Sequence, residues 1–150
     1  MAHHIDGFIA HRRVRALVEG ARHVRLALLP QDFCFIERVR TPSGLGAPLF
    51  PELPDLTQDQ LDFAHVLSRS APIAYVTTEY FGGMGSQAAA VWSQGELVLP
   101  PVETDEKAVL LDGALNRALR LLGVRVQTGA LDEFDALGLG TFRSNPEFFD

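Results

Sequence analysis

The stretch of residues 73–81 constrains the fold more than any other part of this sequence. β-Branched and aromatic residues dominate it, and such residues favour a strand. The glycine-rich residues 82–86 follow, and residues 87–93 predict a strand that returns beside the first. Glycine adopts the positive φ angles that tight hairpin turns need, so these segments predict an antiparallel hairpin.

A second tight turn extends this hairpin. Gln94-Gly95 is typical of a turn, and residues 96–99 predict a third strand that Pro100-Pro101 ends. The sequence therefore predicts a three-stranded meander. Trp92 lies at the end of an apolar run within it, so we expect its side chain to be buried in the sheet.

The N-terminal part predicts one helix and one further hairpin. Apolar residues recur at helical spacing over residues 8–21, and Asp6 precedes them as an expected N-cap. Residues 24–29 and 33–39 predict two strands that are joined by a turn at Gln31-Asp32. The apolar face expected on the helix consists of Val14, Leu17, Val18 and Ala21.

A proline-rich segment separates this part from the meander. Residues 41–56 contain repeated prolines and glycines, which predict a loop, but also enough apolar residues to fix that loop to the core. A loop of this length is a candidate contact surface. Thr57 and Gln60 then form a capping-box pattern at the start of a helix expected over residues 57–68.

The C-terminal part predicts two more helices. Apolar spacing indicates a helix over residues 113–122, which Gly123 ends. Residues 131–137 predict a short acidic helix, and we expect the last ten residues to be irregular. The carboxylates that we expect to be exposed on the acidic helix are Asp132, Glu133 and Asp135.

These elements predict an α+β fold. We expect a mostly antiparallel sheet of about five strands, with two or three helices packed on it. A chain of 150 residues is long enough for one domain with a substantial core. We therefore expect residues 1–150 to form a single domain.

Charge and composition narrow the choice of partners and compartment. The formal net charge of −6 argues against nucleic acid, because phosphate binding depends on clustered lysine and arginine. No apolar run approaches the roughly 20 residues of a membrane helix, and the N-terminus lacks a signal-peptide pattern. Cys34 is the only cysteine, so no internal disulfide forms, and an apolar neighbourhood predicts that it is buried. We expect a cytoplasmic protein.

Recognised catalytic and cofactor motifs do not occur in the sequence. The histidines show no metal-ligand spacing, and the residues around Ser86 depart from the hydrolase pattern G-x-S-x-G. The dinucleotide and P-loop fingerprints are absent as well. We therefore expect no metal and no cofactor, and we assign no catalytic residue.

The glycine-rich turn remains a candidate binding site. Glu79 interrupts an apolar strand, and Tyr80 and Gln87 lie near it across the expected hairpin. This group could bind a ligand or carry acid–base chemistry, or Glu79 could simply face solvent. The backbone at Gly82, Gly83 and Gly85 could likewise hold an anion or only form a tight turn.

Residues 74–92 and 115–124 resemble segments of small bacterial proteins of the immunity type, which belong to polymorphic toxin systems. The resemblance implies a cytoplasmic protein that neutralises a cognate toxin without catalysis, and it carries over no active-site residue. An acidic surface suits a basic partner such as a nuclease toxin. The surfaces we nominate are the acidic helix, the proline-rich loop and the hairpin. The alternative is a small enzyme or ligand-binding protein that uses the region from Glu79 to Gln87.

Overall fold

The computed structural model describes residues 3–21, 23–38, 49–54, 56–81, 84–105 and 113–149. The strands in this part of the chain form a six-stranded antiparallel sheet with the order β2-β3-β1-β4-β5-β6. The strands are β1 (His3–His11), β2 (Val24–Leu28), β3 (Phe33–Arg38), β4 (Ile73–Phe81), β5 (Met84–Ser93) and β6 (Glu96–Asp105). The expected α+β class is confirmed, with six strands in place of about five.

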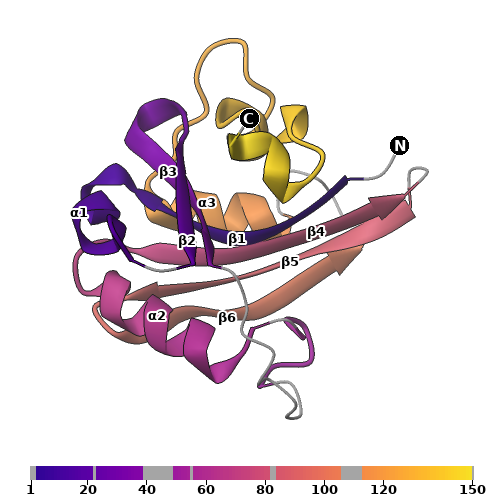
Figure 1. Cartoon of the computed structure of the whole chain (residues 1–150). Coiled ribbons are helices and arrows are strands. Elements are labelled where there is room, and N and C mark those ends of the chain that lie inside the picture. Colours follow the sequence, from indigo (N-terminus) through magenta and orange to yellow (C-terminus); the bar gives the residue numbers. More distant parts are fainter. Residues whose placement is uncertain are drawn as a thin grey trace.

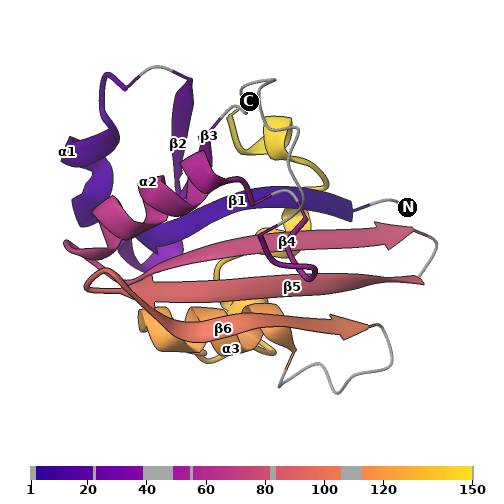
Figure 2. The same ribbon diagram turned by 90° about the horizontal axis from the view of Figure 1, so that it is seen from below.

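Helices cover both faces of the sheet. The α-helices are α1 (Arg15–Val18), α2 (Gln58–Ser68), α3 (Ala114–Leu122) and α4 (Glu133–Ala136). Short 3-10 helices span Arg12–Val14, Pro30–Asp32, Leu139–Thr141 and Asn145–Phe149. Figure 1 and Figure 2 show α2 against one face of the sheet and α3, with the C-terminal segment, on the other. Within the ranges given above, none of the helices has the length and apolar character needed to cross a membrane.

Alternation along β4 divides the buried side chains between two cores. Ala74 and Val76 belong to the core beneath α3, whereas Ile73 and Tyr75 belong to the core beneath α2. Successive side chains of a strand point to opposite faces of the sheet, and here both faces are covered. All four residues are therefore fully buried.

The prediction of a helix over residues 8–21 is wrong for the first part of this range. That part belongs to β1, which pairs with β3 on one side and with β4 on the other. Ile5, Phe8 and Ile9 have no exposed surface, because both faces of this central strand are covered. A strand buried on both faces carries a continuous apolar run, so it lacks the alternation that marks a half-exposed strand.

The apolar face expected on that helix is only partly buried. Val14 and Val18 pack into the core beneath α2, but Leu17 is 52% exposed and Ala21 is exposed as well. The α-helical part, α1, is a single short turn, which is too short to bury a full apolar stripe.

The role expected for Asp6 is wrong for the same reason. Asp6 lies inside β1 and caps no helix. Its side chain is 8% exposed, and the Tyr75 hydroxyl donates a hydrogen bond of 2.6 Å to its Oδ1 atom. A buried carboxylate needs such donors to offset its loss of hydration.

The expected end of the third meander strand at Pro100-Pro101 is also wrong. β6 continues through both prolines to Asp105. The pairing of Ala89 with Val102 and of Val91 with Leu99 leaves the two prolines opposite one residue of β5. β6 is an edge strand, and a bulge at an edge tolerates prolines because no neighbouring strand needs their missing N–H groups.

Other local predictions are confirmed. β2 and β3 form an antiparallel hairpin whose turn places Gln31 and Asp32 at positive φ. The Thr57 hydroxyl accepts a hydrogen bond of 3.3 Å from the Gln60 N–H at the start of α2. The Gln60 side chain donates to the Arg38 carbonyl oxygen instead of returning to the cap, so only half of the capping box forms.

The end of α3 and the burial of Trp92 also agree with expectation. Gly123 adopts φ +99° and ends α3, as the left-handed conformation requires. Trp92 is 1% exposed and belongs to the core beneath α2.

The structure describes the proline-rich segment and the turn of the hairpin only in part. Residues 41–48 of the proline-rich segment, with Gly82 and Gly83 of the hairpin turn, lie outside the described residues. The described part of the proline-rich segment is fixed to the core by Leu53 and Leu56, both of which are buried.

The expectation of an irregular C-terminus is wrong over most of its length. Asn145–Phe149 forms a 3-10 helix, and Phe148 stacks between Phe35 and Phe142, with ring centroids 4.0 and 4.1 Å away. The aromatic side chains bury the C-terminal segment against the face of the sheet that carries α3.

Candidate functional site

The pairing of β4 with β5 separates the residues of the predicted polar cluster. Thr78 lies opposite Gln87, and Glu79 lies opposite Ser86. Directly paired residues place their side chains on the same face of a sheet, and neighbours along a strand alternate. The side chains of Glu79 and Gln87 therefore lie on opposite faces and do not form one cluster.

The Gln87 side chain stabilises the start of α3. Its Nε2 atom donates a hydrogen bond of 2.7 Å to the Tyr80 hydroxyl, and its Oε1 atom accepts one of 2.7 Å from the Leu115 N–H. The first N–H groups of a helix have no partner within the helix, and Gly113 in the N-cap position offers no side chain. Gln87 thus supplies from β5 a cap for the Leu115 N–H at the start of α3.

Gly85 is needed for close packing within the hairpin. It lies opposite Tyr80, and a Cβ atom at this position would lie 1.9 Å from the Glu79 carbonyl oxygen. The position therefore accepts only glycine without displacement of the β4 backbone. This steric requirement accounts for Gly85 without a bound anion.

The acidic residues of α4 bind α3 and α4 together. Asp132 caps α4 by accepting a 2.8 Å hydrogen bond from the Asp135 N–H, and it also accepts one of 3.1 Å from Asn116 Nδ2. Glu133 is 5% exposed and accepts a hydrogen bond of 2.9 Å from Arg120 Nε. The expectation that Glu133 is exposed is therefore wrong, because this carboxylate is buried in contact with the Arg120 guanidinium of α3.

Of these three carboxylates, only Asp135 is exposed. Asp132 is half-buried, and Asp135 itself accepts a hydrogen bond of 2.9 Å from the Leu131 N–H. Helix α4 thus offers less free negative charge than the sequence indicates.

Glu79 lines a small pocket on the face of the sheet that carries α2. The pocket has a volume of about 140 Å³, and three glutamates from separate segments surround it: Glu52, Glu79 and Glu103. We call this site the acidic pocket. Its lining includes His4 but no lysine or arginine among the described residues, and none of the three glutamates forms an ion pair with a described residue.

The sheet pairing and the proline-rich segment bring these glutamates together. Glu79 pairs with Ser86, and Glu103 pairs with Ala88 two residues further along β5, so both carboxylates lie on the same face. Figure 2 shows the segment before α2 lying over β4, which places Glu52 beside them. Glu79 and Glu103 are exposed and Glu52 is half-buried.

No sequence pattern identifies Glu52 or Glu103 as a site residue. Glu103 lies in the part of β6 beyond the prolines, where no strand was expected. Glu52 lies in the proline-rich segment, which the sequence nominates as a contact surface without indicating which residue takes part.

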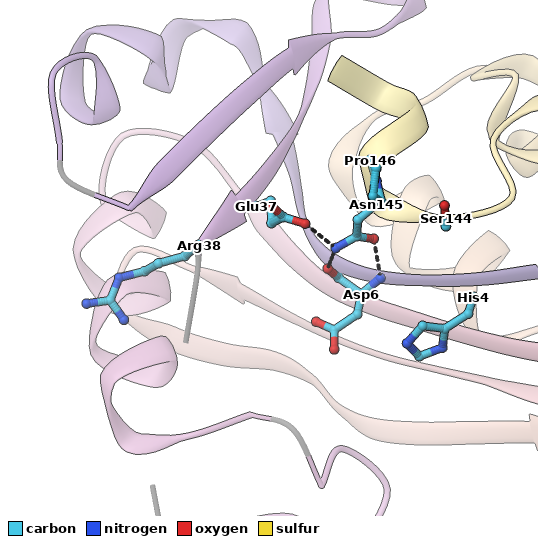
Figure 3. A pocket seen from close by; sticks show the side chains of 7 residues that line it. All are labelled: His4, Asp6, Glu37, Arg38, Ser144, Asn145 and Pro146. Atoms are coloured by element: carbon cyan, nitrogen blue, oxygen red, sulfur yellow. Dashed lines mark hydrogen bonds between the residues drawn. The ribbon is translucent and has the colours of Figure 1, made fainter. Parts of the chain in front are cut away.

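A larger cleft lies where two strands separate. β1 pairs with β3 only from Phe8 to His11, and the C-terminal segment then replaces β3 beside β1. The cleft between them has a volume of about 490 Å³, and Asp6, Glu37 and Asn145 line it. Figure 3 shows that the Arg38 side chain points away from these residues.

The polar groups of this cleft bind one another. Asn145 Nδ2 donates to Glu37 Oε2 at 2.8 Å, and Arg25 Nη2 donates to Glu37 Oε1 at 2.5 Å. The Arg25 guanidinium also lies 4.2 Å from the Phe149 ring centroid. These contacts attach the C-terminal segment to β2 and β3, so the cleft has a structural role.

The two N-terminal histidines are held by the same threonine. His4 Nδ1 donates to the Thr78 carbonyl oxygen at 3.0 Å, and the Thr78 hydroxyl lies 2.7 Å from His3 Nδ1. In the described part of the chain, no three metal-ligating side chains come close enough to bind an ion together.

Cys34 is buried and poorly suited to nucleophilic chemistry. Burial raises the pKa of its thiol from 9.0 to about 11, and Sγ donates a hydrogen bond of 3.4 Å to the Ala10 carbonyl oxygen. The thiol therefore stays protonated near neutral pH, and the thiolate is the reactive form.

Comparison with protein-family models, curated proteins and solved structures gives no match. The function must therefore be inferred from the residues themselves. Of the predicted binding residues, only Glu79 lines the acidic pocket with a free carboxylate, while Tyr80, Gln87, Asp132 and Glu133 make internal contacts.

Proposed function

We propose that this protein is a cytoplasmic binding module that neutralises a basic partner protein, a cognate bacterial toxin, through the acidic pocket. The observation that carries the proposal is that Glu52, Glu79 and Glu103 line one pocket from three segments, with no lysine or arginine of the described chain in its lining. The resemblance to immunity-type proteins agrees with this interpretation.

The electrostatics of the pocket favour a basic partner. Three carboxylates line one pocket, and their negative charge attracts a lysine or arginine side chain from outside. The net charge of −6 also attracts a basic partner over longer distances. Complementary charge raises the rate of encounter and suppresses wrong partners.

The size of the pocket favours a protein side chain over a metabolite. Its volume is about 140 Å³, whereas sites for small molecules usually enclose roughly 300–1,000 Å³. We infer that one basic side chain of the partner enters the pocket and that surrounding contacts supply the remaining interface. The proposed place of action is the bacterial cytoplasm, where a lone buried thiol such as Cys34 stays reduced.

Co-expression with the product of the adjacent gene tests the proposal. We expect a stable one-to-one complex on size exclusion, and we expect host growth to be protected from that product. The double variant Glu79→Lys/Glu103→Lys should lose the complex, whereas Glu96→Lys should keep it. Glu96 is a matched control because it is exposed on the same strand, at the end opposite Glu103.

Two results would contradict the proposal. One is that the double variant binds and protects as well as the wild type. The other is that no complex forms and that deletion of the gene leaves growth unchanged in the presence of the neighbouring gene product.

A further inference from the structure

A second depression lies on the same face of the sheet, between α1 and α2. It has a volume of about 470 Å³. We call it the α1–α2 groove. Leu17, Val24, Phe63 and Val66 contribute apolar side chains to it, and Asp59 and Asp62 contribute carboxylates from α2. Figure 2 shows α1 and α2 on this side of the sheet.

The apolar lining of the groove is incompletely covered by the described chain. Leu17 is 52% exposed and Val66 is 59% exposed, and both face the same depression. Single exposed apolar residues are common on protein surfaces, but exposed apolar residues that converge in a groove mark a binding surface. Leu17, which belongs to the apolar face of α1, is part of this surface.

The α2 side of the groove is acidic. Asp59 and Asp62 are exposed, and neither forms an ion pair with a described residue. Asp62 accepts a hydrogen bond of 2.9 Å from Gln58 Nε2. Arg38 is the basic residue of the groove lining, and its guanidinium lies 5.6 Å from the Phe63 ring centroid.

We propose that the α1–α2 groove binds an amphipathic helix of a partner protein. Apolar side chains of that helix contact Leu17 and Val66, and lysine or arginine residues beside its apolar stripe lie opposite Asp59 and Asp62. Grooves between helices commonly accept the apolar face of a third helix in this way. Charge complementarity with the α2 carboxylates selects a basic helix over an acidic one. The inference does not depend on the acidic pocket, because it rests on different residues.

Fluorescence anisotropy with the full chain tests this inference. The probe is a labelled leucine/lysine peptide of about 14 residues, roughly four helical turns, with its leucines on one face. A scrambled peptide of the same composition, which has no apolar face, separates groove binding from simple charge attraction. The variants are Val66→Asp and Asp59→Asn/Asp62→Asn, and the control is Leu131→Asp, at a residue that is 83% exposed and does not line the groove.

We expect the wild type to bind the amphipathic peptide about tenfold more tightly than Val66→Asp does. The Asp59→Asn/Asp62→Asn variant should bind more weakly and with a smaller dependence on salt, and Leu131→Asp should match the wild type. Circular dichroism of each variant verifies that the fold is retained. The inference is overturned if the scrambled peptide binds equally well, if Leu131→Asp loses binding to the same degree, or if the wild type forms a dimer that Val66→Asp abolishes.

Discussion

The side-chain amide of Asn145 pairs with the backbone of Asp6 as a neighbouring strand would. Asn145 Oδ1 accepts a hydrogen bond of 2.9 Å from the Asp6 N–H, and Asn145 Nδ2 donates one of 2.7 Å to the Asp6 carbonyl oxygen. The pairing of β1 with β3 does not extend to Asp6. One side chain therefore satisfies a stretch of strand edge that would otherwise lose its partners (Figure 3).

Replacement of Asn145 should destabilise the protein. Asn145→Ala leaves the Asp6 backbone groups and Glu37 Oε2 without this partner, and we expect a loss of about 2 kcal/mol in the free energy of unfolding. Asn145→Asp should cost more, because a carboxylate donates no hydrogen bond and repels Glu37. Urea unfolding measures both effects. The control Gln127→Ala, at an exposed residue, should stay within about 0.5 kcal/mol of the wild type.

Replacement of Gln87 should loosen the first turn of α3. Gln87→Ala removes the acceptor for the Leu115 N–H. We expect the free energy of unfolding to fall by about 1–2 kcal/mol, as for other helix caps. Amide hydrogen exchange at Leu115 should accelerate more than exchange at the end of the helix. Equal exchange rates in the wild type and the variant would show that Gln87 does not cap α3.

Replacement of Gly85 should be costly because of the close approach of β4. Gly85→Ala places a methyl group against the Glu79 carbonyl oxygen. We expect the free energy of unfolding to fall by at least about 2 kcal/mol. Gly140→Ala is the control, since a Cβ atom there lies 3.4 Å from the nearest atom, in the Phe134 ring. If the two variants melt at the same temperature, the close packing of the hairpin is not essential.

Because the thiol of Cys34 is buried, the free energy of unfolding should decrease at alkaline pH. Burial raises its pKa from 9.0 to about 11, so the unfolded chain releases this proton at lower pH than the folded protein does. The stabilisation is fully present below pH 9 and is lost as the pH rises to about 11, by up to about 3 kcal/mol. Urea unfolding at both pH values measures it. Cys34→Ala should show a smaller loss over the same interval, and an identical loss would contradict the assignment to Cys34.

Local patterns predicted the meander, the β2–β3 hairpin, α2 and α3. Each of these elements is defined by residues near in sequence, such as the β-branched run of β4 or Gly123 at the end of α3. The sequence predicts a helix where the last part of β1 lies, because the apolar run of this strand is buried on both faces, and only its partners β3 and β4 show that. Burial on two faces depends on contacts that the sequence does not display.

The candidate site was harder to predict than the fold, because its residues come from separate segments. Glu79 was found as a charge within an apolar strand, but Glu52 and Glu103 reach it only through the folding of the chain. Gln87 resembled part of a binding cluster, and it caps a helix that begins 27 residues later. Tertiary hydrogen bonds of this kind have no local sequence pattern.

Quantitative capture from lysate of the source organism tests the central claim most directly. The baits are the tagged wild type, Glu79→Lys/Glu103→Lys and Glu96→Lys. Each captured fraction is washed at physiological salt, because high salt screens charge attraction, and is analysed by mass spectrometry. We predict that the wild type and Glu96→Lys retain the same basic protein in a one-to-one ratio and that the double variant loses it. Equal retention by all three baits, or retention of no stoichiometric protein by any of them, would contradict the claim that the acidic pocket binds a basic partner.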